Sequence, residues 1–102
     1  MEIIKGRVDC LPEETGYDSS RITALNEHFQ RLIEKEMIWG TQYTISQKGK
    51  EIASASMGQG SPVDDVPMKP DTVFRIASIT KTFTTVAIMK LVEDGYIRLD
   101  TA

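Results

Sequence analysis

The chain has 102 residues, a length typical of one small domain. Hydrophobic residues make up 40% of it and charged residues 26%, which is a globular composition and excludes an intrinsically disordered chain. The net charge of −3 and the pI near 5.1, with no run of Lys or Arg, argue against a nucleic-acid partner.

The first residues carry no targeting signal that the sequence reveals. Residues 1–7 contain neither a long apolar run nor a small-residue cleavage site, so they do not form a signal peptide. No stretch approaches a membrane-spanning length, and no membrane partner is expected. We therefore expect a cytoplasmic protein, or a periplasmic or extracellular one if an export signal has been lost. Residues 1–17 are expected to form an extended lead-in, and Cys10, the only cysteine, excludes an internal disulfide.

A first helix is predicted over residues 21–36, with Asp18, Ser19 and Ser20 as candidate N-caps. Apolar residues recur there at helical spacing and define one apolar face. They are Ile22, Leu25, Phe29, Leu32, Ile33 and Met37. His28, the only histidine, lies beside this face, and we assign it a structural or solvent role because no partner motif accompanies it.

The next segment predicts a β-hairpin. Apolar and polar residues alternate over 43–48, the sequence Lys-Gly-Lys at 48–50 is typical of a tight turn, and 52–57 reads as a second strand. A long loop over 58–70 follows, because glycine and proline recur in it.

Two patterns in this loop do not predict a ligand site. Gly58 and Gly60 lack the third spaced glycine and the following helix of a phosphate loop. Asp64 and Asp65 have no matching third ligand, so we interpret them as a solvated acidic turn. Neither a metal nor a cofactor is therefore expected.

A second helix is predicted after Ser78. Residues 79–94 contain neither glycine nor proline, and Gly95 is typical of a helix C-terminus. Ser78 lies where this helix should begin, and Lys81 follows one turn later on the same face. Apolar residues cover most sides of the helix, which is typical of a central helix with several packing neighbours.

The spacing of Ser78 and Lys81 suits acyl transfer. A serine hydroxyl is a weak nucleophile until a nearby base takes its proton, and Ser-Lys pairs are a variant of the catalytic triad. The start of the helix adds partial positive charge, which favours an oxyanion. The alternative is that Ser78 caps the helix and Lys81 is an ordinary solvated side chain.

The flanking residues resemble a known family. The sequence Phe-Arg-Ile-Ala-Ser-Ile-Thr-Lys at 74–81, with Thr84 and with Leu-Val-Glu-Asp-Gly-Tyr-Ile-Arg-Leu-Asp at 91–100, is similar to the active-site segment of the serine β-lactamase and penicillin-binding protein superfamily. Gly-Tyr-Asp at 16–18 and the segment 39–50 resemble the same group. The most similar branch contains class C β-lactamases, DD-peptidases and family VIII esterases.

The resemblance runs from about Leu11 to the last residue and implies an α+β fold. Residues 18–102 would form the N-terminal part of a larger serine hydrolase domain. Ser78 would attack a carbonyl carbon, with its own N–H as an oxyanion donor, and Lys81 would act as general base. A lysine amine is almost fully protonated in neutral water, so such a base needs burial or neighbouring positive charge.

The resemblance also implies what this chain lacks. Neither the family's Tyr-x-Asn motif nor its Lys-Thr-Gly or His-Thr-Gly motif is found in the sequence, so we expect these 102 residues alone to be inactive. The substrate would be a β-lactam, a D-Ala-D-Ala peptide or a small ester, and a cytoplasmic location favours the ester. The alternative is a truncated or split-domain piece that acts as a binding or assembly module. It would need the C-terminal part, or would self-associate through its strand edge and apolar helix.

Overall fold

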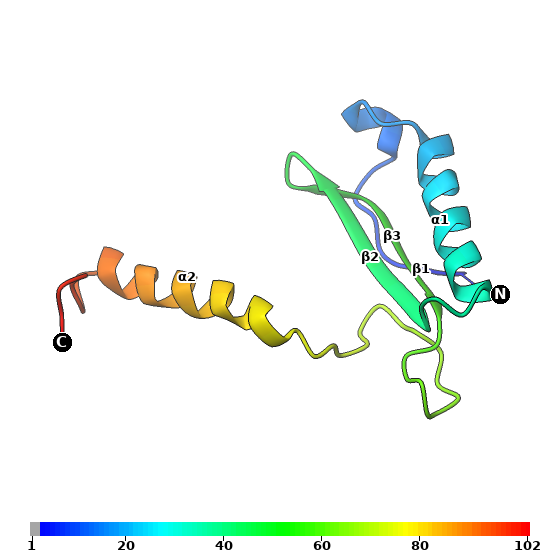
Figure 1. Ribbon diagram of the computed structural model, residues 1–102. Helices are drawn as coiled ribbons and strands as arrows, with labels where there is room; N and C mark the ends of the chain where they lie inside the picture. The colour runs from blue at the N-terminus through cyan, green and yellow to red at the C-terminus, as the bar shows by residue number, and fades with distance from the viewer. Residues whose placement is uncertain (1–2) are drawn as a thin grey trace. The chain divides into compact units, whose positions relative to one another are not determined.

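The computed structural model describes residues 3–102, which form two units, residues 3–72 and residues 73–102. The first unit contains a three-stranded antiparallel sheet and helix α1 (Ser19–Glu34). The second contains helix α2 (Thr80–Glu93) (Figure 1). The predicted α+β class is confirmed.

The predicted hairpin forms two of the three strands of the sheet. Strands β2 (Gly40–Gln47) and β3 (Lys50–Gly58) pair antiparallel, with a register shift between Ile45 and Ser46. Lys48 and Gly49 form the turn with φ values of 53° and 78°. Two successive positive φ values match the twist of a hairpin, and Gly49 adopts its value without steric cost.

The N-terminal segment differs from the extended lead-in that we predicted. Strand β1 (Ile3–Lys5) pairs antiparallel with β3, with Ile3 opposite Met57, so the strand order is β1-β3-β2. A short 3₁₀ helix, η1 (Pro12–Thr15), follows, and Glu14 Oε2 accepts a hydrogen bond from the Leu11 N–H at 2.7 Å. Local capping and a long-range strand pairing thus give this segment regular structure.

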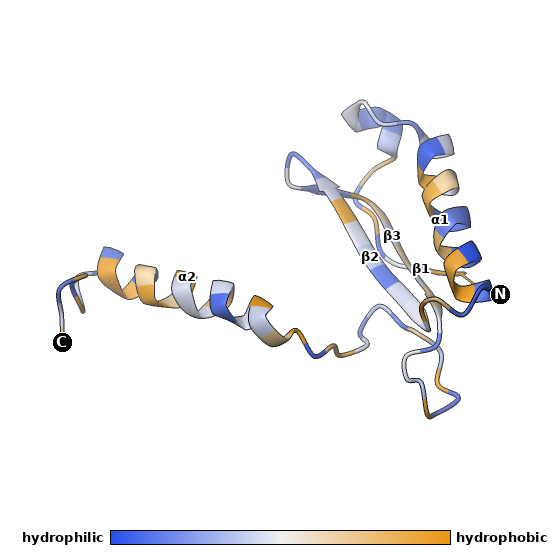
Figure 2. Ribbon diagram, in the orientation of Figure 1, coloured by the Kyte–Doolittle hydropathy of each residue, from blue (hydrophilic) through white to orange (hydrophobic). Residues whose placement is uncertain are grey.

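Helix α1 confirms the first predicted helix, with both ends two residues earlier. Asp18 is the N-cap, and its carboxylate accepts a hydrogen bond from the Ser20 N–H at 2.9 Å. This bond to the charged form lowers the pKa of Asp18 below its ordinary value. Hydrophobic residues lie along the side of α1 that faces the sheet (Figure 2).

The core of the first unit lies on β3 and in the loop after it. Among residues 3–102, the buried side chains are Pro12, Ile52, Ala53, Ala55, Ser56, Met57 and Met68. Five of these seven residues belong to β3, the central strand, which has a neighbouring strand on each side. Met68 shows that the loop after β3 folds back and completes this core.

Helix α2 confirms the second predicted helix and its C-terminus. Gly95 has φ 83°, its N–H donates to the Val92 carbonyl, and the Tyr96 N–H donates to the Leu91 carbonyl. These two bonds form a Schellman motif, which satisfies the carbonyls of Leu91 and Val92 at the end of the helix. None of the helices described here is long and apolar enough to cross a lipid bilayer.

Within residues 73–102, no other element covers the apolar sides of α2, a helix for which we expected too few packing partners in this chain. Almost all of its side chains are exposed, including Phe83 at 66% and Val86 at 64%. Its ion pairs lie near its C-terminus, where Lys90 Nζ approaches Asp94 at 3.1 Å and Glu93 at 3.8 Å.

Candidate active site

Ser78 lies in a 3₁₀ turn, η2 (Ala77–Ile79), that runs directly into α2. The Ile79 N–H donates to the Ile76 carbonyl at 3.0 Å and closes this turn. The α-helix itself begins at Thr80, two residues after the position that we predicted. Ala77, whose φ of 45° is left-handed, cannot be part of a right-handed α-helix, so the helix lies wholly after it.

The hydroxyl of Ser78 does not cap the helix. The structure gives no side-chain cap bond at the start of η2 or of α2, and within residues 3–102 the Ser78 Oγ has no hydrogen-bond partner. The capping alternative is therefore wrong for Ser78.

Lys81 lies in the first turn of α2, three residues after Ser78. Its side chain is exposed and forms no ion pair with the described part of the chain. No hydrogen bond joins the Lys81 amine to the Ser78 hydroxyl among the described residues. The structure thus confirms the one-turn spacing, and a direct Ser78–Lys81 contact stays a prediction, as does the Ser78 N–H as oxyanion donor.

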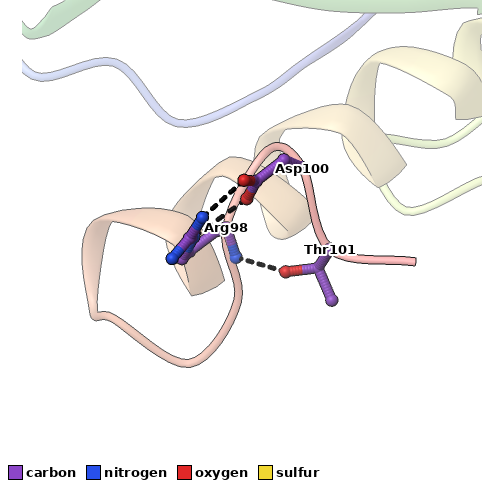
Figure 3. Close-up of polar contacts among 3 residues, drawn as sticks. All are labelled: Arg98, Asp100 and Thr101. Atoms are coloured by element: carbon purple, nitrogen blue, oxygen red, sulfur yellow. Dashed lines mark hydrogen bonds and ion pairs between the residues drawn. The ribbon is translucent and has the colours of Figure 1, made fainter.

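The end of the second unit is a compact polar turn (Figure 3). The Arg98 guanidinium makes a two-pronged contact with the Asp100 carboxylate, and the Arg98 N–H donates to Thr101 Oγ1 at 2.8 Å. The hydrogen bonds from Arg98 lower the pKa of Asp100 below its ordinary value. All three side chains are satisfied locally, so we assign this turn a structural role.

The other residues that the sequence singled out do not come together. His28 is exposed, with its ring 5.9 Å from that of Phe29. Asp64 lies in a loop turn where its N–H approaches Ser61 Oγ at 3.3 Å. Cys10 is a free thiol of intermediate exposure. Within residues 3–102, no three His, Cys, Asp or Glu side chains gather into a metal site.

Two polar contacts of β2 could not be found from the sequence. Tyr43 donates to Asn26 of α1, and the Gln42 side chain binds the carbonyls of Lys69 and Pro70. Adjacent strand residues point to opposite faces, so these two contacts lie on opposite sides of the sheet. No motif marks either contact, because the partners are 17 to 28 residues apart in the chain.

Comparison with known proteins places the chain in a family. A family model described as beta-lactamase matches residues 25–102. Serine beta-lactamase-like protein LACTB, mitochondrial, from Bos taurus is 37% identical over 89 residues, which are 87% of this chain and 16% of that protein.

Bacterial relatives match over a similar length of the chain. Protein flp from Staphylococcus aureus is 32% identical over 88 residues, 86% of this chain and 17% of its own length. Esterase EstB from Burkholderia gladioli is 27% identical over 90 residues, 87% of this chain and 23% of its own length. The chain thus spans less than a quarter of each of these relatives. Since the family model matches more than half of the chain and includes both Ser78 and Lys81, the chain belongs to the beta-lactamase family.

Proposed function

We propose that this chain carries the nucleophile and the general base of a beta-lactamase-like serine hydrolase. The observation that carries the proposal is the position of Ser78 in the turn directly before α2, where its hydroxyl forms no helix-capping bond. Lys81 follows three residues later, and both residues lie inside the family match. A helix N-terminus has free backbone N–H groups, which favour developing negative charge.

The reaction would proceed through an acyl-enzyme. Ser78 Oγ attacks the substrate carbonyl carbon while the neutral Lys81 amine takes the hydroxyl proton. The tetrahedral oxyanion collapses, the bond to the leaving group breaks, and the leaving group takes up a proton. Water then attacks the acylated Ser78 and releases the carboxylic acid together with the free hydroxyl.

We favour a small carboxylic ester over a β-lactam or a D-Ala-D-Ala peptide. The support for this choice is the relative from Burkholderia gladioli, which is named an esterase. The sequence of this chain holds neither further family motif, so we also propose that turnover needs groups beyond these 102 residues.

Covalent labelling of Ser78 tests this function. The protein at its full natural length is incubated with a p-nitrophenyl ester, and separately with a β-lactam and a fluorophosphonate, and its intact mass is measured. We expect an adduct that maps to Ser78 and is lost in Ser78→Ala. Ser46→Ala is the matched control, because Ser46 is an exposed β2 residue without a side-chain hydrogen bond among the described residues. Absence of any Ser78 adduct with all three probes would refute the hydrolase.

An assembly module is the second candidate, and the exposure of α2 favours it. Within the second unit, apolar side chains of α2 such as Phe83, Val86 and Ile88 are exposed. Strand β2 also forms one edge of the sheet. If these surfaces bind a partner without catalysis, light scattering coupled to size exclusion should show a dimer or larger species of the 102-residue chain. A compact monomer would contradict that role.

A further inference from the structure

An open hollow lies where α1 ends and the chain enters the sheet. Its volume is about 600 Å³, and its lining comes from the last turn of α1, the loop before β2 and the end of β3. The lining residues are Ile33, Glu36, Ile38, Trp39, Gly58 and Gln59. All of them belong to the first unit, so the hollow is built by one compact part of the chain.

The backbone at Trp39 is held by the sheet and by α1. The Gln59 N–H donates to the Trp39 carbonyl at 2.9 Å. A Cβ on Gly58 would lie 2.5 Å from that carbonyl oxygen and 3.0 Å from Ile33 Cδ1, so only glycine lets these elements approach so closely. The Trp39 side chain is nevertheless 62% exposed. The hollow therefore carries a large aromatic surface on a well-held backbone.

Glu36 brings a carboxylate to the same hollow from a strained position. The Glu36 N–H donates to the Ile33 carbonyl at 3.0 Å, and the next N–H, of Met37, bonds the preceding carbonyl at the same distance. These bonds end α1 with a Schellman motif, in which Glu36 is the left-handed residue with φ 56°. At the end of α2 the equivalent residue is Gly95. A side chain is disfavoured at this φ, and such strained residues cluster at ligand-binding sites.

The charge of Glu36 has no counterpart in the part of the chain that the structure describes. The ion pairs of residues 3–102 include neither Glu36 nor the basic residues nearest to it in sequence, Lys35 and Arg31. A carboxylate attracts a cation by its charge, and an exposed indole ring attracts one through the negative face of its π-system. Both groups line one hollow, so their attractions act on the same ligand.

We propose that this hollow binds an organic ammonium ion, a role that does not depend on the proposed hydrolase. Glu36 supplies the counter-charge, Trp39 supplies a cation–π contact, and the apolar lining contacts the alkyl groups of the ligand. A metal ion fits poorly. The lining side chains with oxygen atoms are those of Glu36 and Gln59, whereas Ca²⁺ takes about six to eight oxygen ligands.

A charged ligand and its neutral isostere test the proposal. Choline and 3,3-dimethylbutan-1-ol have the same shape, with nitrogen in the first and carbon in the second. Each is titrated into the protein at its full natural length, and saturation-transfer NMR measures binding. We expect saturable binding of choline, with the neutral alcohol bound at least about tenfold more weakly. Equal binding of the two, or no saturable binding of choline, would overturn the proposal.

Substitutions locate the binding at this hollow. Glu36→Gln should weaken choline binding about 2- to 5-fold, and Trp39→Leu about 3- to 10-fold, because each removes one source of attraction. Glu34→Gln is the matched control, since it makes the same charge change at the last residue of α1, outside the hollow. It should bind choline as the wild type does. Wild-type affinity in Glu36→Gln or Trp39→Leu, or an equal loss in Glu34→Gln, would contradict the site.

Glu36→Gly separates binding from folding. Glycine relieves the left-handed strain, so this variant should unfold at a higher urea concentration than the wild type. It also lacks the carboxylate, so it should bind choline as weakly as Glu36→Gln. A more stable protein with weakened binding supports the proposal, because a purely structural role of Glu36 would not divide the two effects in this way. A glycine variant that keeps wild-type affinity would overturn it.

Discussion

The Tyr43 hydroxyl donates a hydrogen bond to Asn26 Oδ1, and this bond joins β2 to α1. The Tyr43 ring also lies 5.9 Å from the ring of Phe29. Both polar residues line a hollow of about 240 Å³ between the helix and the sheet, together with Ile22 and Ala53. A partly buried polar group without a hydrogen-bond partner destabilises the folded state. The Tyr43–Asn26 bond therefore stabilises one placement of α1 on the face of the sheet.

Removing one member of this pair should lower the free energy of unfolding. We expect Tyr43→Phe to cost about 1 kcal/mol, because the Asn26 oxygen loses its donor while the ring stays in place. Urea denaturation of the wild type, Tyr43→Phe, Asn26→Ala and the double variant measures the coupling. If the two single effects simply add, the hydrogen bond does not contribute to stability.

The same tyrosine predicts a loss of stability in alkali. Burial raises the pKa of Tyr43 above its ordinary value. The folded state therefore keeps the phenol proton at a pH where the unfolded chain has released it. Stability is full below the ordinary tyrosine pKa near 10 and falls as the pH rises through the raised value. Melting temperatures between pH 8 and pH 11 should fall less for Tyr43→Phe than for the wild type.

Elements with local signals could be predicted, and elements that depend on distant partners could not. The cap at Asp18 and the turn at Gly49 follow from neighbouring residues, and both were predicted. Strand β1 was missed because its three residues become a strand only by pairing near Met57, far along the chain. A strand this short has no periodicity that distinguishes it from a loop.

The candidate site shows the same division. The spacing of Ser78 and Lys81 is local and was visible in the sequence, together with the helix that follows. The 3₁₀ turn was not, because no propensity predicts a positive φ at Ala77. The hydrogen bonds of Gln42 could not be predicted either, because their acceptors are backbone carbonyls, which every residue carries.

The C-terminus of α2 depends on the left-handed conformation of Gly95. A Cβ at this residue would meet no atom within 4 Å, so a substitution there costs only backbone conformational energy. We expect Gly95→Ala to lower the free energy of unfolding by about 1 kcal/mol, and Gly95→Asn to lower it less, because asparagine tolerates this conformation. Urea denaturation of the wild type and both variants ranks their free energies of unfolding. Alanine and asparagine variants of equal stability would contradict the Schellman motif.

The role of Lys81 as general base makes a prediction about acylation. Lys81→Ala should lower the acylation rate of Ser78 by about 10²- to 10⁴-fold, which is the usual contribution of a positioned base. Lys81→Arg should not restore it, because a guanidinium does not give up its proton. Lys90→Ala, on the same helix but paired with Asp94, is the control and should leave the rate unchanged. The rate is measured by stopped-flow with a p-nitrophenyl ester, and wild-type acylation by Lys81→Ala would exclude this base.

Ala77 carries conformational strain directly before the nucleophile. A residue with a Cβ at φ 45° is disfavoured by about 1–2 kcal/mol, and strain of this kind persists only where surrounding structure or function requires it. Ala77→Gly should therefore raise the free energy of unfolding by about 0.5–1 kcal/mol, less than the full strain because glycine also makes the unfolded chain more flexible. Ala77→Val should lower it, since a β-branched side chain fits this region worst.

If the strained turn holds Ser78 in its reactive place, Ala77→Gly also acylates more slowly despite its greater stability. Urea denaturation measures the stability of these variants, and stopped-flow release of p-nitrophenol from a p-nitrophenyl ester measures their rate of Ser78 acylation on the same samples. A glycine variant that is both more stable and faster in acylation would show that the strain has no part in positioning Ser78.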